Sequence, residues 1–166
     1  MVINWPLLQS QRYSEVYTDI AAIRSIAPHP IILKVILETA QLSRHEIIAG
    51  CKIAEAARAD FVKTSTGFNG RGANTENVSL MKNLVSPSGM KVKASGGVKM
   101  VNECVAMMEA GADRIGTSSG VWIINEALSL LDQATHDASS GQGHESQQPS
   151  ATLTRVFSSS EDEVPY

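Results

Sequence analysis

Branched apolar residues gather in five short runs along the first 120 residues, at nearly regular intervals. Each run has the length and the valine and isoleucine content of a β-strand. The predicted strands cover residues 1–4, 31–37, 60–65, 91–95 and 114–118. Because strands that recur about every 30 residues leave room for a helix between them, this pattern predicts parallel βα units.

The stretches between these runs place apolar residues at the spacing of a helix. The predicted helices cover residues 13–26, 44–58, 75–84, 101–110 and 121–134. Ser43 with Glu46 three residues later predicts a capping box at the start of the second helix. Strands alternating with helices indicate an α/β protein, built either as an open doubly wound sheet or as a (β/α)₈ barrel.

The composition changes after residue 134, where serine, glutamine, glycine, threonine and acidic residues replace the periodic apolar positions. Such a segment cannot bury enough apolar surface to fold, so residues 135–166 are expected to form a disordered polar tail. Residues 1–134 then form one domain. The formal net charge is -3, and the acidic excess lies in the tail, so a nucleic-acid surface is not expected.

The N-terminus has no basic region followed by an apolar stretch, and no apolar run approaches the 20 or so residues that span a bilayer. The sequence therefore predicts a cytoplasmic protein with no membrane partner. Cys51 and Cys104 stand singly and lack the close spacing of a zinc site or redox pair. Both are expected to be reduced thiols, and no metal site is expected.

Lysines stand within the predicted strands, where alternate residues share one face of the sheet. For Lys34 and Lys91 the ordinary interpretation is a side chain that keeps its ammonium group in water. Lys63 and Lys93 would bring two ammonium groups close together, and a like charge lowers the pKa of a lysine. A lysine with a lowered pKa can attack a carbonyl and form a Schiff base.

The predicted strand ends are rich in glycine and hydroxyl groups. In parallel α/β folds, sites lie at the carboxyl ends of the strands, and free N–H groups at helix starts bind anions. The turns containing Gly96 and Gly97, and Ser118 and Ser119, both lead into predicted helices. Together they predict a phosphate site built by two neighbouring loops.

Four segments resemble the deoxyribose-phosphate aldolase family: residues 33–39 (LKVILET), 61–68 (FVKTSTGF), 92–98 (VKASGGV) and 111–120 (GADRIGTSSG). The resemblance extends from Met1 to about residue 125. It implies that Lys63 forms the Schiff base and that Lys93 tunes it, with Lys34 as possible support. The substrate phosphate would be held by Gly67, Gly96, Gly97, Ser118 and Ser119.

A complete (β/α)₈ barrel needs at least about 200 residues, so the fold expected here is a partial barrel of about the last five βα units. The family's proton-relay aspartate would fall just before Met1. Its members also carry three earlier strands, so open sheet edges and a possible homo-oligomer are expected. Tyr166 ends the chain as a tyrosine does in some members, where that tyrosine helps at the active site.

The resemblance implies a class I aldolase that reversibly cleaves 2-deoxy-D-ribose 5-phosphate to D-glyceraldehyde 3-phosphate and acetaldehyde, without a cofactor. Its partner would be a small phosphorylated sugar. Two alternatives stay open at this point. The chain could be a truncated, catalytically silent module for phosphate binding or interaction, or a different Schiff-base or phosphate-binding barrel enzyme.

Overall fold

The computed structural model describes residues 1–140, which contain a parallel β-sheet. Its strands are β1 (Lys34–Ile36), β2 (Phe61–Lys63), β3 (Lys91–Ser95) and β4 (Arg114–Gly116), in the order β1-β2-β3-β4. Residues 1–3 lie beside β1, where Val2 forms a parallel bridge with Ile36 and the Ile3 N–H donates to the Ile36 carbonyl at 2.9 Å. Four of the five predicted strands are therefore confirmed: β3 has the predicted bounds, and β1, β2 and β4 are shorter than predicted. The predicted strand at residues 1–4 is present only as this isolated bridge.

The helices are α1 (Trp5–Gln9), α2 (Tyr13–Ile26), α3 (Arg44–Ala56), α4 (Thr75–Val85), α5 (Val101–Glu109) and α6 (Gly120–Ser140), with 3₁₀ turns η1 (Thr39–Gln41) and η2 (Ser86–Ser88). Helix α1 was not predicted, because five residues are too few to show a helical period. The predicted capping box between Ser43 and Glu46 is present at the start of α3. Within the described residues, no helix combines the length and apolar character that crossing a bilayer would require.

Helix α6 continues six residues past its predicted end at Ala134. Residues 135–140, assigned to the disordered tail by composition, are helical instead. No glycine or proline interrupts the chain before Gly141, and a polar helix can extend without an apolar stripe while its backbone hydrogen bonds continue. The remainder of the predicted tail, including Tyr166, lies outside the described residues.

The chain divides into two compact units. The larger unit comprises Met1–Val98 and Ala106–Thr117 and holds the whole sheet with helices α1 to α4. The second unit comprises Lys99–Val105 and the residues from Ser118 onward. Within the second unit, the Glu126 carboxylate on α6 accepts the Val101 N–H at 3.0 Å.

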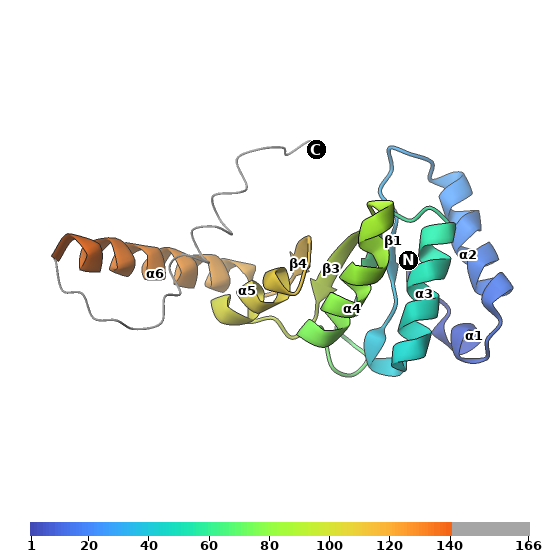
Figure 1. Ribbon diagram of the computed structural model, residues 1–166, viewed down its shortest axis with the longest axis horizontal. Coiled ribbons are helices and arrows are strands. Elements are labelled where there is room, and N and C mark those ends of the chain that lie inside the picture. Colours follow the sequence, from blue (N-terminus) through green and yellow to red (C-terminus); the bar gives the residue numbers. More distant parts are fainter. Residues whose placement is uncertain (141–166) are drawn as a thin grey trace. The chain divides into compact units, whose positions relative to one another are not determined.

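In the larger unit, α2, α3 and α4 stand side by side against the sheet (Figure 1). On β1, β2 and β3, every second strand residue faces these helices and is fully buried, as the period of a strand requires. The buried strand residues are Val35, Val62, Val92 and Ala94, and the fully or nearly fully buried helix residues include Ile20, Ile47, Val78 and Met81. The other face of the sheet carries the lysines.

Two eleven-residue segments of this fold are similar, with six identical positions: residues 57–67 read ARADFVKTSTG and residues 110–120 read AGADRIGTSSG. In both segments the residue after the first alanine has a positive φ, 58° at Arg58 and 103° at Gly111, which turns the chain from helix to strand. The aspartate, Asp60 or Asp113, then directly precedes a strand. The same type of turn thus precedes both β2 and β4.

The two repeated aspartates make equivalent contacts. Asp60 Oδ2 accepts the Leu33 N–H at 2.6 Å, and Asp113 Oδ2 accepts the Val92 N–H at 2.7 Å. Each also pairs with a cation from a helix, Asp60 with Arg24 and Asp113 with Lys82. Because Leu33 gives its N–H to a side chain, β1 begins at Lys34, three residues later than the apolar run predicts.

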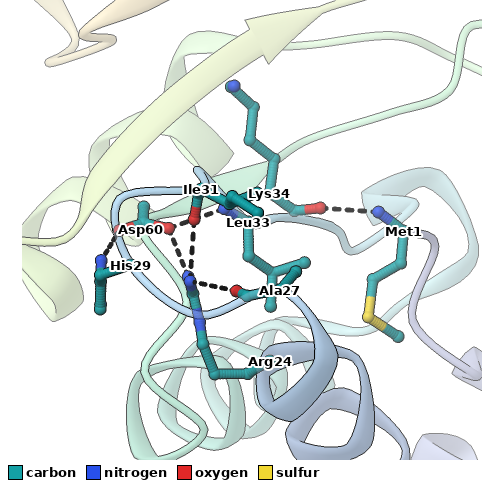
Figure 2. Close-up of polar contacts among 8 residues, drawn as sticks. All are labelled: Met1, Arg24, Ala27, His29, Ile31, Leu33, Lys34 and Asp60. Carbon is teal, nitrogen blue, oxygen red and sulfur yellow. Dashed lines mark hydrogen bonds and ion pairs between the residues drawn. The ribbon is translucent and has the colours of Figure 1, made fainter.

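Arg24 closes the loop between α2 and β1 (Figure 2). Its guanidinium group donates to the Ala27 carbonyl at 3.0 Å, to the Ile31 carbonyl at 2.9 Å and to the Asp60 carboxylate. Burial alone would raise the pKa of Asp60, but the hydrogen bonds from the Leu33 N–H and from Arg24 outweigh it, and the pKa lies below its ordinary value. This ion pair holds the amino-terminal end of the sheet.

Candidate active site

The predicted site lysines lie together on the sheet face opposite the helices. Lys63 on β2 is in register with Lys93 on β3 and with Ile36 on β1. Lys34 precedes Ile36 by two residues, so it shares the same face. All three lysine side chains are partly buried, whereas Lys91 is exposed. The structure therefore brings together the lysines that the sequence singled out.

An aromatic ring lies beneath two of the cations on this face. Phe61 is 4% exposed, and its ring centre lies 4.9 Å from Lys34 Nζ and 5.0 Å from the Arg114 guanidinium carbon. The negative face of the ring attracts both cations. These contacts place Lys34 over Phe61, at the amino-terminal end of β2, with Lys63 two residues further along that strand.

Lys63 has a pKa below the ordinary lysine value. Desolvation by burial is the largest cause and repulsion from Lys93 the next, while attraction to Glu38 acts in the opposite direction. The pKa of Lys34 is also lowered, first by desolvation and then by Arg114 and Lys93. A larger fraction of neutral amine is the condition that nucleophilic attack on a carbonyl requires.

Gly116 on β4 makes room for the Lys93 side chain. A Cβ atom at Gly116 would lie 2.7 Å from Lys93 Cε and 3.3 Å from its Nζ. Since non-bonded carbon atoms do not approach so closely, any other residue at this position would displace the lysine. The glycine at this position of β4 thus leaves the space in which the Lys93 ammonium group lies.

The loops after β2 and β3 approach each other through glycines. A Cβ at Gly72 would lie 2.0 Å from the Gly96 carbonyl oxygen, and one at Gly96 would lie 3.6 Å from the Gly67 Cα. The Ala73 N–H donates to the carbonyls of Ser95 and Gly96 at 3.1 and 3.0 Å. Gly67, Gly96 and Gly97 all have positive φ, which glycine adopts without strain.

The predicted phosphate residues fall in two different units. Gly67, Gly96 and Gly97 belong to the larger unit, while Ser118 and Ser119 belong to the second and directly precede α6. The Ser119 carbonyl accepts the Ile123 N–H at 3.0 Å, so it joins the first turn of that helix. A single anion site built from all of these residues stays a prediction.

Glu38 is a buried charged residue that the sequence reasoning missed. It follows the apolar run of β1, has 0% exposure and adopts the left-handed backbone conformation, with φ 60° and ψ 58°. Its carboxylate accepts the N–H and the hydroxyl of Thr66 in the loop after β2. An acidic residue at the end of an apolar strand is the signal that could have identified it, because carboxylates are seldom buried without a partner.

The family model for DeoC/LacD family aldolases matches residues 1–125. This chain belongs to the DeoC/LacD aldolase family. A deoxyribose-phosphate aldolase of Coccidioides immitis is 55% identical over 128 residues, which are 76% of this chain and 48% of that relative. One from Thermococcus kodakarensis is 47% identical over 76% of this chain and 57% of its own length. The chain spans about half the length of these curated relatives.

Solved structures agree with the family membership. A crystal structure from Coccidioides immitis, 54% identical, matches with a TM-score of 0.75 over 77% of this chain and 51% of that one. The deoxyribose phosphate aldolase from Aeropyrum pernix, described as a unique tetramer, matches with a TM-score of 0.66 at 36% identity, over 72% of this chain and 51% of its own. The prediction of an α/β fold forming part of an aldolase barrel is confirmed.

Proposed function

We propose that this chain carries the Schiff-base centre of a cytoplasmic deoxyribose-phosphate aldolase, with Lys63 as the nucleophile. The observation that supports the proposal is the partly buried Lys63 in register with Lys93, near the carboxyl ends of parallel strands where barrel enzymes hold their substrates. The substrate is 2-deoxy-D-ribose 5-phosphate and the products are D-glyceraldehyde 3-phosphate and acetaldehyde. A homo-oligomer belongs to the same proposal, and a monomeric mass by light scattering would contradict it.

The reaction needs one neutral amine and proton transfers. The Lys63 amine adds to the C1 aldehyde of the open-chain sugar and water leaves, which gives a protonated imine. A base removes the C3 hydroxyl proton, the C2–C3 bond breaks, and its electron pair moves onto C2 and the imine to form an enamine. Glyceraldehyde 3-phosphate departs. The enamine is protonated at C2, and water hydrolyses the imine to release acetaldehyde and the free lysine.

Reductive trapping tests this proposal on the full 166-residue chain. Incubation with acetaldehyde and borohydride should add one ethyl group, and peptide mass spectrometry should locate it at Lys63. Trapping requires only the activated amine, so it is independent of any proton relay elsewhere. A silent phosphate-binding module would acquire no adduct, and that outcome would overturn the proposal.

Lys93 is assigned the role of keeping the Lys63 amine neutral. Lys93→Met removes the charge and keeps an unbranched side chain over Gly116, so the pKa of Lys63 should rise toward its ordinary value. Trapping should then slow about tenfold at pH 7 and little at pH 10, as expected for a shift of about one pKa unit. Lys91→Met, on the same strand but exposed, is the matched control. Equal rates for Lys93→Met and wild type at pH 7 would contradict the assignment.

The phosphate site is assigned to Gly67, Gly96, Gly97, Ser118 and Ser119. Ser118→Asp places a negative charge just before α6 and should weaken binding of inorganic phosphate about fivefold. Ser129→Asp adds the same charge at an exposed position within α6 and should leave binding unchanged. Phosphate titrations followed by NMR measure both affinities, and equal weakening in the two variants would show that the site lies elsewhere.

A further inference from the structure

We propose that Glu38 is a positioning residue for Lys63, acting through Thr66 on the loop that follows the lysine's strand. The inference rests on the proposed function, since it concerns how the predicted nucleophile is held. Glu38 comes from β1's carboxyl end and Thr66 from the segment three residues after Lys63.

The Glu38 carboxylate accepts its hydrogen bonds from Thr66. Both carboxylate oxygens accept the Thr66 N–H, Oε1 at 3.1 Å and Oε2 at 3.3 Å, and Oε2 also accepts the Thr66 hydroxyl. The Thr66 hydroxyl oxygen in turn accepts the Phe68 N–H at 3.2 Å. One buried carboxylate therefore orders the turn that contains Gly67.

The backbone on both sides supports the same connection. The Leu37 N–H donates to the Lys63 carbonyl at 2.9 Å, and the Thr39 N–H donates to the Thr64 carbonyl at 2.9 Å. Glu38 lies between these two bonds in the left-handed conformation, which is unfavourable for a non-glycine residue. Such a conformation persists where the surrounding contacts require it, and here those contacts join β1 to the loop after Lys63.

The charge of Glu38 also acts on Lys63. The charged groups around Lys63 are Lys93 from β3, Lys34 from β1, the Met1 amino group beside β1, and Glu38. The first three are cations, and Glu38 alone among these four is an anion. Removing its charge while keeping its shape should therefore lower the pKa of Lys63, in the opposite direction to removing Lys93.

Two variants separate the effect of the Glu38 charge from the effect of its hydrogen bond to the Thr66 hydroxyl. Glu38→Gln keeps an acceptor for the Thr66 N–H but has no charge, so the pH midpoint of acetaldehyde trapping should fall by about one unit. Thr66→Val keeps the charge and loses the hydroxyl, so the midpoint should stay while the plateau rate falls about threefold or more. Thr66→Ser restores a hydroxyl and should recover the wild-type plateau. Circular dichroism confirms that each variant is folded.

An unchanged midpoint in folded Glu38→Gln, or an unchanged plateau in Thr66→Val, would overturn the inference. If Glu38→Gln does not fold, the comparison of Thr66→Val with Thr66→Ser decides. A wild-type chain that traps no acetaldehyde would overturn the proposed function instead. The inference is then decided by NMR titration of the Lys63 side chain, whose pKa should be lower in Glu38→Gln than in wild type.

Discussion

Lys63→Ala should abolish the ethyl adduct that acetaldehyde and borohydride form on the wild-type chain. The substitution removes a partly buried amine with a lowered pKa at the end of β2, four residues before Gly67. Because it also removes one of two neighbouring cations, the fold should tolerate it. Intact-mass spectrometry after a fixed incubation at pH 7 measures the loss, which is expected to exceed about a hundredfold.

The control for this experiment is Lys91→Ala, which removes an exposed lysine from the neighbouring strand and should leave the adduct unchanged. Lys34 is the competing candidate, because its pKa is lowered as well. An adduct that persists in Lys63→Ala and maps to Lys34 would transfer the role of nucleophile to β1.

Asp60→Asn should lower the free energy of unfolding by about 3 kcal/mol. The change leaves the Arg24 guanidinium, whose side chain is only 10% exposed, without its anionic partner. Urea denaturation followed by circular dichroism measures the effect. Glu15→Gln breaks the ion pair between Glu15 and Arg12, whose side chains are 51% and 56% exposed respectively. This variant should lose less than about 0.5 kcal/mol of unfolding free energy. Equal costs for the two variants would contradict the assigned role of burial.

The loss of unfolding free energy caused by Asp60→Asn should also depend on pH. The folded-state pKa of Asp60 lies below its unfolded value of about 3.8, so its ionised form contributes stability above that pH. This contribution is lost as the pH falls below 3.8 and through the folded-state pKa. The stability difference between wild type and Asp60→Asn should therefore shrink in acid, and a difference that stays constant from pH 7 to pH 2 would contradict the shift.

The positions of the strands and most helices could be predicted because buried faces repeat with the period of each element. Valines on β1, β2 and β3 face the helices, and the lysines between them face the other way. The same period of two, with a parallel order of strands, is sufficient to predict Lys63 beside Lys93, and the two are in register in the sheet. Regular local geometry was sufficient for these predictions.

Other features depend on contacts between distant residues and left little sign in the pattern. The late start of β1 follows from Asp60, 27 residues beyond Leu33, which takes the Leu33 N–H. The burial of Glu38 depends on Thr66, 28 residues later. Composition likewise could not show that α6 continues to Ser140, because polar residues form helices and tails equally well.

The similar segments at residues 57–67 and 110–120 form the same turn and strand start but contribute differently to the lysine site. They share the turn and the aspartate that start each strand but differ at the third strand position, which is Lys63 in one and Gly116 in the other. A lysine in the second segment would occupy the space that Lys93 fills. The segment at residues 110–120 is therefore compatible with the Lys63–Lys93 pair only because it has glycine at position 116, where the segment at residues 57–67 has Lys63.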